Sequence, residues 1–242
     1  MCYSKMYTVY VCIFYALLQG VYGVIDWAAA IGAAAAAASA VTSGTSMLQS
    51  LAGATGYRVV CSVEIENWTK YPLLYPESFI NGGMIKHPPV AVRPGQKEMF
   101  IAHKTGHTAT GTFGTASWLI ASSNRRAVVM WSCPFNFDHY TNWLGVGLTS
   151  PGNTDHQKHW FNQMYNEQNT TGLQYTLGEY YYHTKTISMK DKQFEITGIM
   201  GTSHKAKAHI IVRPLKLEDL AQPIKKRILR KRRSLTDDFK EH

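Results

Sequence analysis

The 242-residue sequence is poor in cysteine and in long apolar runs. Cys2 and Cys12 lie in the N-terminal stretch, so only Cys61 and Cys133 remain for the rest of the chain. A framework of several disulfides is therefore excluded, and the remaining pair forms either one bridge or two buried thiols. Beyond its first residues the chain has no stretch that reaches the roughly 20 apolar residues of a transmembrane helix.

The residues that enzymes need are also scarce. The sequence has no Gly-x-Ser-x-Gly motif and no glycine-rich loop leading into Lys-Ser or Lys-Thr, which disfavours hydrolase and nucleotide-binding functions. The pairs His103/His107 and His156/His159 have spacings found at metal sites, but no third-ligand motif accompanies them. Cys133 has no basic neighbour that would activate it. We therefore expect no catalytic residues, no metal and no cofactor.

The net charge of +9 does not indicate a nucleic-acid-binding protein. Much of the excess lies in the C-terminal residues 216–242, and residues 24–215 carry 15 basic and 11 acidic side chains, a net charge of only +4. That balance gives weak attraction to anionic surfaces but no basic stripe of the kind that nucleic-acid binders show. Nucleic acid is therefore not an expected partner.

Residues 1–23 are typical of a secretory signal peptide. Lys5 supplies the positive charge, residues 7–18 the apolar run, and Val21-Tyr22-Gly23 a small-residue cleavage site. We expect a secreted protein whose mature chain begins at Val24. In such a protein, Asn67-Trp68-Thr69 would be a possible glycosylation acceptor and would mark a surface position.

Residues 24–57 form an N-terminal segment that is rich in alanine. Alanine is the best helix former, so we expect a helix here despite Gly32. The helix either packs on the domain or moves from one environment to another. The second alternative is open because alanine gains little free energy from burial, so that burial does not hold the helix in one environment. Residues 24–43 would span roughly 30 Å as a helix, which is enough to cross the hydrocarbon core of a bilayer.

Residues 58–215 change character and predict a mainly β fold. Residues 58–66 alternate as a strand does, and residues 127–131 and 207–212 are apolar runs typical of buried strands. Short strands separated by glycine- and proline-containing turns are typical of a β-sandwich. One helix interrupts the pattern, with Thr154-Asp155 as its expected cap and an end near Glu167.

Residues 132–143 bring four aromatic rings, an imidazole and a proline into twelve positions. A core strand has no use for Pro134 or for the polar residues between the rings, because proline cannot donate to a ladder and buried amides need partners. The stretch is either an exposed aromatic loop or a loop whose rings fold back onto the core. Exposed rings with polar tips suit a membrane interface, a lipid headgroup or a sugar.

These residues resemble a known family. The stretch Trp131–Trp143 resembles the Pro-(aromatic)-Asp-Tyr-x-x-Tyr-Ser-Asn-Trp loop of the actinoporins, and Thr108-Ala109-Thr110-Gly111 resembles their Val-Ala-Thr-Gly turn. The helix at 155–165 stands where the family has its second helix. The resemblance covers residues 24–213 and is nearest to the secreted actinoporin-like toxins of molluscs. The chain departs from the family pattern at His139, Leu144 and Met164, so the resemblance does not specify the lipid.

The resemblance implies a compact β-sandwich flanked by two α-helices. Such a protein is monomeric in solution, docks on target-cell membranes that carry phosphocholine lipids such as sphingomyelin, and assembles there into a homo-oligomeric, cation-conducting pore. Carried over position by position, the phosphocholine pocket would consist of Phe113, Ser132, Pro134, Tyr140, Trp160, Met164 and Tyr165. The membrane-contacting rim would consist of Phe135, Phe137, His139 and Trp143. The inserting helix would gain most from Ile25, Trp27, Ile31 and Val41.

Two alternatives stay open at this stage. A β-sandwich with the same pocket would also suit a non-lytic, lectin-like protein that binds lipids or glycans without perforating a membrane. The basic tail, residues 216–242, is expected to be extended or helical without a core of its own. It is either removed by a processing protease at Arg230–Arg233 or retained as an electrostatic contact with anionic membranes.

Overall fold

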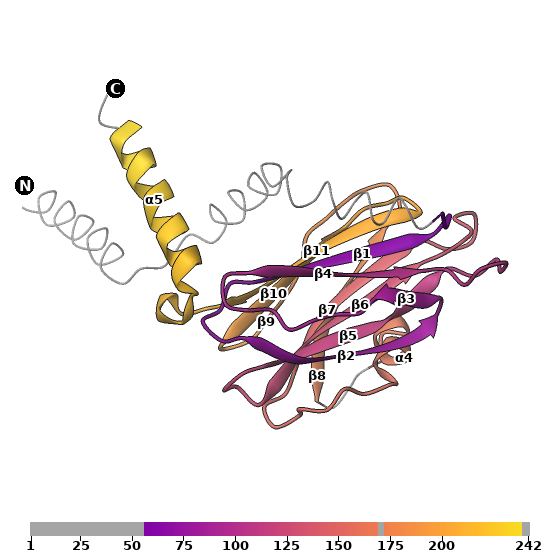
Figure 1. Ribbon diagram of the computed structural model, residues 1–242, viewed down its shortest axis with the longest axis horizontal. Coiled ribbons are helices and arrows are strands. Elements are labelled where there is room, and N and C mark those ends of the chain that lie inside the picture. Colours follow the sequence, from indigo (N-terminus) through magenta and orange to yellow (C-terminus); the bar gives the residue numbers. More distant parts are fainter. Residues whose placement is uncertain (1–55, 169–171, 239–242) are drawn as a thin grey trace, which may run out of the picture. The chain divides into compact units, whose positions relative to one another are not determined.

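The computed structural model describes residues 56–168 and 172–238, the last eight of these by backbone alone. The expected signal peptide and the alanine-rich segment up to Thr55 lie outside the described residues, as do the expected insertion residues, Ile25, Trp27, Ile31 and Val41. The described part is a sandwich of two β-sheets, which confirms the predicted fold class (Figure 1).

One sheet has six strands in the order β3-β4-β1-β11-β10-β9 and the other has five in the order β2-β5-β6-β7-β8. The six-stranded sheet consists of β1 (Val60–Asn67), β3 (Met84–His87), β4 (Lys97–His103), β9 (Ile187–Lys190), β10 (Phe194–Met200) and β11 (Lys205–Pro214). The five-stranded sheet consists of β2 (Leu73–Gly82), β5 (Thr112–Ile120), β6 (Arg125–Cys133), β7 (Asn142–Thr149) and β8 (Leu173–Tyr180). The strands expected at 58–66, 127–131 and 207–212 correspond to β1, β6 and β11.

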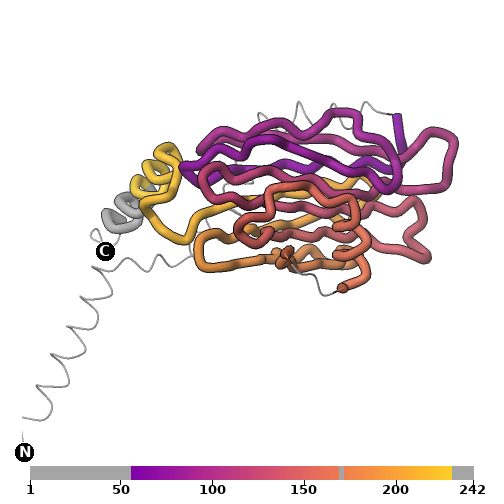
Figure 2. Tube along the Cα trace, turned by 90° about the horizontal axis from the view of Figure 1, so that it is seen from below, coloured from indigo at the N-terminus to yellow at the C-terminus, as the bar shows by residue number. Residues whose placement is uncertain are grey.

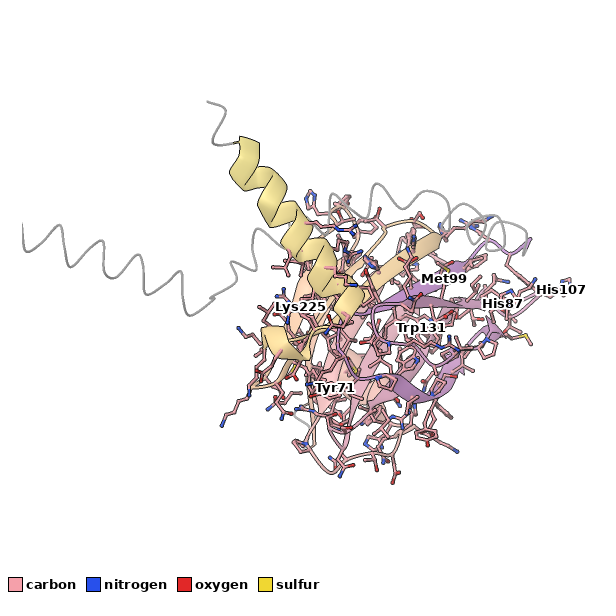
Figure 3. The ribbon with its side chains drawn as sticks, turned by 60° about the vertical axis from the view of Figure 1, so that its left-hand side comes forward. Tyr71, His87, Met99, His107, Trp131 and Lys225 are labelled. Atoms are coloured by element: carbon pink, nitrogen blue, oxygen red, sulfur yellow. The ribbon has the colours of Figure 1, made fainter. Side chains whose placement is uncertain are left out.

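Strand β6 shows how the sequence builds two layers of core. Its residues alternate in direction, so that Val129 and Trp131 face the core between the sheets while Val128 and Met130 face outward. Between the sheets, where Figure 3 labels Trp131, its ring packs edge-on against Phe100 of β4. The ring centroids are 5.2 Å apart. The outward residues form a second apolar cluster, which α4 (Trp160–Tyr165) covers. Because both faces are covered, every residue of β6 is buried.

Strands β1 and β11 pair in parallel, with Val60 opposite Lys205 and Asn67 opposite Val212. All other strand pairs in the two sheets are antiparallel. One end of the sandwich therefore holds the starts of β1 and β11 together with the end of β6, since the backbone amide of Val60 bonds to the carbonyl of His204, and the His204 ring lies 2.9 Å from the Phe135 carbonyl. We call this the aromatic end. The ends of β1 and β11 form the opposite end.

The helix α4 is shorter than the sequence predicted. It begins at Trp160 and not after Thr154-Asp155, and its first residue has no side-chain cap. The backbone carbonyl of Thr154 instead accepts a hydrogen bond from the buried guanidinium of Arg126, at 2.8 Å. This contact and the insertion of His156 against β5 hold residues 154–156 out of a helical conformation. Tertiary contacts therefore overrode a sequence signal for a helix cap.

The C-terminal tail also differs from the prediction, because its first part packs on the sandwich. The chain forms the 3₁₀ turn η1 (Leu217–Asp219) and then α5 (Gln222–Asp238), which leaves the sandwich at the end opposite to the aromatic end (Figure 2). Leu220, Ala221 and Ile224 are almost fully buried. The compact domain thus continues past the expected boundary at residue 215.

Polar contacts fix the same part of the tail. Asp219 forms an ion pair with Lys70 at 2.7 Å and accepts a hydrogen bond from the Tyr71 hydroxyl at 3.0 Å. Arg227 pairs with Glu66 at 3.3 Å and lies over the Trp68 ring, 5.5 Å from its centroid. The expected processing residues Arg230 and Arg233 lie further along α5.

Asn67 is fully buried, which contradicts its expected role as a surface glycosylation acceptor. Its side-chain amide donates to the carbonyls of Tyr71 and Val92 at 2.8 and 3.1 Å, and its oxygen accepts from the backbone and hydroxyl of Thr69. Every hydrogen-bonding position of the amide is therefore used within the fold. The Asn-Trp-Thr sequence serves a turn after β1 and cannot carry a glycan in this structure.

Candidate membrane-binding site

Two of the expected pocket residues and one of the expected rim residues lie side by side across the five-stranded sheet. Phe113 of β5 is opposite Ser132 of β6, and Ser132 is opposite Trp143 of β7. Residues opposite each other in a sheet point to the same face, so these side chains form one row. They lie on the outer face, where Phe113 and Trp143 pack against the cluster under α4.

Two rings of α4 extend this row into a wall. Phe161 packs against Phe113 with centroids 5.2 Å apart, and it stacks on Tyr165 at 5.5 Å. Tyr165 in turn meets Trp143 edge-on at 6.0 Å. The spacing of Phe161 and Tyr165, four residues apart on one helix face, accounts for their stacking. Phe161 was not among the expected site residues.

The expected pocket residues differ sharply in exposure. Tyr140 is 60% exposed and Tyr165 is 37% exposed, so both can meet a ligand. Trp160 and Met164 are only 4% and 0% exposed, because they face the sheet under α4. These two residues support the wall from beneath and have no surface to offer to a headgroup. The expectation that they touch a ligand directly therefore does not fit the structure.

His156 fixes the start of the α4 region. Its ring nitrogens lie 2.8 Å from the Ser117 hydroxyl and 3.2 Å from the Thr115 hydroxyl, and the Trp160 ring meets it edge-on at 4.9 Å. Burial and the neighbouring charge of Arg126 lower the pKa of His156 to about 4. The imidazole is therefore neutral at physiological pH and acts as a structural hydrogen-bonding group.

The resemblance of residues 108–111 to a family turn has a physical reason in the structure. A β-carbon on Gly111 would lie 1.9 Å from the carbonyl oxygen of Cys133 and 2.8 Å from the Cα of Pro134. Only glycine allows the turn to approach the base of the aromatic loop this closely. Pro134 itself is buried at this contact and contributes shape to the site.

The rim residues of the aromatic loop, residues 134–141, do not all face solvent. The Phe135 ring packs against the main core, and the cations of Arg58 and Lys104 lie 4.9 and 5.5 Å from its centroid. Phe137 is half-buried, whereas His139 and Tyr140 are exposed. The ring of Phe135 thus folds back onto the core, as one interpretation of the sequence expected, whereas Tyr140 is exposed, as the other expected.

The aromatic loop meets two rings that were not among the expected site residues, those of His204 and Tyr181, and Tyr182 lies beside Tyr181. Phe137 lies 4.1 Å from the His204 ring and 6.4 Å from the Tyr181 ring, and Tyr181 lies 4.2 Å from Tyr182, measured between centroids. The run of three tyrosines at 180–182 is the feature of the sequence that could have indicated this contact.

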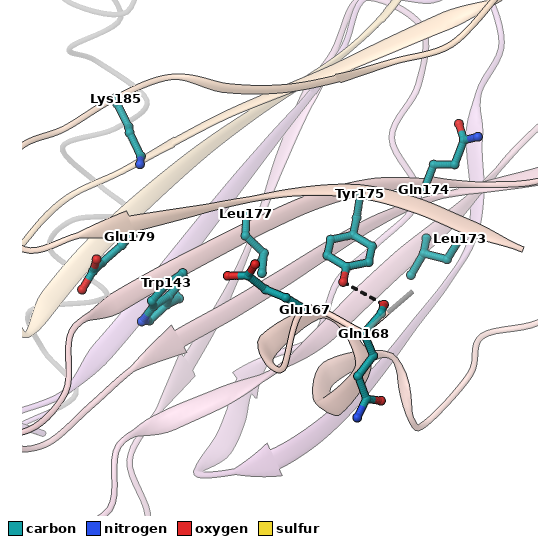
Figure 4. Close-up of a pocket in the computed structure, with 9 residues that line it drawn as sticks. All are labelled: Trp143, Glu167, Gln168, Leu173, Gln174, Tyr175, Leu177, Glu179 and Lys185. Carbon is teal, nitrogen blue, oxygen red and sulfur yellow. Dashed lines mark hydrogen bonds between the residues drawn. The ribbon is translucent and has the colours of Figure 1, made fainter. Parts of the chain in front are cut away.

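A polar pocket of about 700 Å³ opens beside Trp143 (Figure 4). It is lined by Trp143, Glu167, Gln168, Leu173, Gln174, Tyr175, Leu177, Glu179 and Lys185. The Tyr175 hydroxyl donates to the carbonyl of Gln168 at 3.0 Å, and Glu179 accepts a hydrogen bond from Thr141 at 2.9 Å. Carboxylates, amides and two aromatic side chains around a shallow volume suit a polar ligand with several hydroxyl groups.

The other candidate groups are structural where the structure describes them. Cys61 and Cys133 are buried, unbridged thiols, and burial together with the adjacent Cys133 raises the pKa of Cys61. Within residues 56–168 and 172–238, no three histidine, cysteine or acidic side chains gather as metal ligands would. His103 instead stacks on Tyr57, with ring centroids 4.0 Å apart. None of the helices in the same ranges is long and apolar enough to cross a membrane.

Comparison with known proteins agrees with this architecture. Residues 29–214 match the family model described as "Sea anemone cytotoxic protein". Tereporin-Ca1 of Terebra anilis is 46% identical over 183 residues, which cover 72% of this chain and 96% of the relative. Echotoxin-2 of Monoplex parthenopeus is 38% identical over 196 residues, covering 79% of this chain and 71% of the relative.

A solved structure supports the fold independently. The crystal structure of the lipid binding protein Nakanori superposes with a TM-score of 0.52 at 18% identity, covering 69% of this chain and 77% of that one. This likeness concerns the sandwich alone. Taken with the family match and the mollusc relatives, it leads to one conclusion: the chain belongs to the sea anemone cytotoxic protein family, the actinoporins, which are toxins and not enzymes.

Proposed function

We propose that this protein is a secreted pore-forming cytolysin that docks on membranes containing phosphocholine lipids. The observation that carries the proposal is the ring wall of Phe113, Trp143 and Tyr165, which stands beside the Ser132 hydroxyl with Tyr140 and Tyr165 exposed. The names of the mollusc relatives, which include a tereporin, an echotoxin and a conoporin, support the same function.

The chemistry of a phosphocholine headgroup matches this wall. A quaternary ammonium held over an aromatic face gains about 0.5–2 kcal/mol, depending on how dry the contact is. The hydroxyls of Ser132, Tyr140 and Tyr165 would take the phosphate oxygens. Trp160 and Met164 would hold α4 in position without touching the lipid, because they are buried beneath it.

The pore itself would form after docking. Protomers that are monomeric in solution would oligomerise on the target-cell membrane, and residues 24–43 of each would insert to line a cation-conducting pore. The length of that segment as a helix, roughly 30 Å, matches the hydrocarbon core. Alanine contributes little to insertion, so several helices lining one pore are more favourable than a single stable span.

Dye release from vesicles tests the proposal directly. The mature chain should release dye from phosphatidylcholine vesicles and leave vesicles of phosphatidylethanolamine and phosphatidylglycerol intact. A chain that lacks residues 24–43 should still bind phosphatidylcholine vesicles but release nothing. Equal release from both vesicle types would refute headgroup recognition, and docking without release by the complete mature chain would refute the pore.

The polar pocket beside Trp143 favours one alternative, a non-lytic glycan-binding protein. Glu167, Glu179 and Lys185 surround it with groups that pair with sugar hydroxyls. A lectin of this kind would bind glycan-coated vesicles and agglutinate them without leakage. The same dye-release experiment therefore separates the two functions.

A further inference from the structure

The loop between β8 and β9, residues 181–186, presents tyrosines from a rigid base. Tyr180, the last residue of β8, is fully buried in the core between the sheets, and its hydroxyl donates to the carbonyl of Lys185 at 2.8 Å. This bond closes the loop on itself. Tyr181 and Tyr182 project from it and are 37% and 80% exposed. The loop therefore holds two large rings in solvent at a defined position.

The loop of residues 181–186, which we call the tyrosine loop, lies against the aromatic loop and forms one surface with it. Phe137 packs edge-on against Tyr181 and lies over His204, which precedes β11. The Asn142 amide ties the base of the aromatic loop to the β10–β11 turn by donating to the carbonyls of Gly201 and Ser203, both at 3.0 Å. Three separate segments are thus fixed side by side. We call the surface formed by Phe137, Tyr181, Tyr182 and His204 the tyrosine platform.

The charges around the platform match a lipid surface. Arg58, Lys185 and Lys205 are exposed next to it, since Arg58 lies over Phe135, Lys205 follows His204, and Lys185 closes the tyrosine loop. In the ranges that the structure describes, none of the ion pairs involves these three cations. Tyrosine rings favour the headgroup region of a bilayer, and flanking cations favour its phosphates.

We propose that Tyr181 and Tyr182 form a second membrane contact, which enters the headgroup region of phosphocholine bilayers together with Tyr140. This inference rests on the proposed docking function and adds to it. One contact loop leaves a protein free to rock on a surface, whereas two fixed contacts set the tilt of the sandwich. The second loop would thus orient each protomer before assembly.

An environment-sensitive dye at position 182 tests the contact itself. In Tyr182→Cys labelled with NBD, the dye should brighten and shift to the blue on addition of phosphatidylcholine vesicles. Cys61 and Cys133 are buried and stay unlabelled in the folded protein. The matched control is Tyr75→Cys, because Tyr75 is a 69% exposed tyrosine on β2, near the opposite end of β5. Its dye should report water throughout.

The double variant Tyr181→Ser/Tyr182→Ser measures the contribution to binding. It should bind phosphatidylcholine vesicles about five- to tenfold more weakly, with an unchanged unfolding midpoint, whereas Tyr75→Ser should bind normally. Vesicle sedimentation reports docking separately. Normal docking with a water-exposed dye at 182, or unchanged affinity of the double variant, would overturn the second contact and leave the proposed function standing. Absence of docking by the unmodified chain would overturn both.

Discussion

The two ends of the sandwich use similar aromatic residues in opposite ways. At one end, Trp68 is only 5% exposed, because Arg227 lies over its ring and the backbone of Ala221 bonds to its carbonyl at 2.8 Å. At the aromatic end, Tyr140 and Tyr182 are 60% and 80% exposed. Figure 3 shows Tyr71 and Lys225 on one side of the domain and His107, from the loop before β5, on the other.

The difference lies in what covers the rings. The chain itself supplies a cover at one end, through Leu220, Ala221 and Ile224, and supplies none for the tyrosines at the other. Rings that the chain covers contribute to stability, whereas rings left exposed cost little to keep in solvent and offer area to a partner. The cover that the tail forms over Trp68 thus distinguishes the stabilising end from the end that we propose to bind membranes.

The largest expected effect comes from removing the cover. A chain that ends at Leu215 should lose about 3–5 kcal/mol of unfolding free energy, since it gives up the burial of Leu220 and Ile224 and uncovers Trp68. Urea denaturation measures the change. A chain that ends at Arg230 keeps the packed residues and should stay within about 0.5 kcal/mol of the full chain. Equal stability of both truncated chains would contradict a structural role for the start of the tail.

Single-ring removals should separate the two ends. Trp68→Ala should cost about 3 kcal/mol of stability, because it leaves a cavity under α5. Tyr140→Ala should change stability by less than about 0.5 kcal/mol but weaken binding to phosphatidylcholine vesicles about fivefold. Denaturation and vesicle sedimentation measure the two quantities on both variants. If Tyr140→Ala unfolded the protein, the ring would belong to the core.

Low pH should weaken the packing of the tail on the end of the sandwich opposite to the aromatic end. Burial acts to raise the pKa of Glu66, but His209, Trp68 and Arg227 lower it more, and contacts with Lys70 and Tyr71 likewise outweigh burial and lower the pKa of Asp219. A carboxyl whose pKa is lower in the folded state stabilises the fold at pH values above its unfolded-state pKa. This stabilisation is lost as the pH falls through the folded-state pKa.

The stability difference between the full chain and the chain ending at Leu215 should therefore be constant above about pH 5 and shrink below about pH 4. Measuring the difference between two chains cancels the effect of His156, whose lowered pKa acts in both. A difference that stays constant into strong acid would show that the ion pairs do not hold the tail.

The smallest effect concerns salt. The eight residues of β1 separate the two ends by roughly 25 Å, so the basic start of α5 should not reach a flat bilayer that meets the aromatic end. Binding of the full chain to phosphatidylcholine vesicles should change less than about twofold between 0.05 and 0.5 M salt. The double variant Lys225→Gln/Lys226→Gln should bind the same vesicles as the unmodified full chain does at both salt concentrations. A steep salt dependence that this variant abolishes would mean that α5 touches the membrane.

The sequence predicted the sandwich, and it marked a candidate site region, because both depend on local patterns. Strand periodicity located β1, β6 and β11, and the unusual density of rings marked residues 132–143. What it could not supply were contacts between distant segments. Thr154 gave a cap signal, but its carbonyl serves the guanidinium of Arg126, and the burial of Trp160 depends on the sheet beneath α4.

The tail and the tyrosine loop were missed for the same reason. In the sequence, residues 217–227 resemble a charged tail. They are part of the domain because they form an ion pair with the end of β1 and backbone hydrogen bonds with the turn after it. Tyr181 gains significance only because Phe137, 44 positions earlier, lies against it. Candidate contact residues of this kind are visible once the strands are in register, and not before.

The parallel pairing of β1 with β11 has a topological consequence. Two strands that run the same way place the entry of one and the exit of the other at opposite ends of a domain. The described chain therefore enters the sandwich at the aromatic end, where Tyr57 stacks on His103, while the tail departs from the far end. Under the proposed mechanism, the chain thus enters the sandwich at the same end that meets the bilayer, and the tail lies at the end that faces away from it.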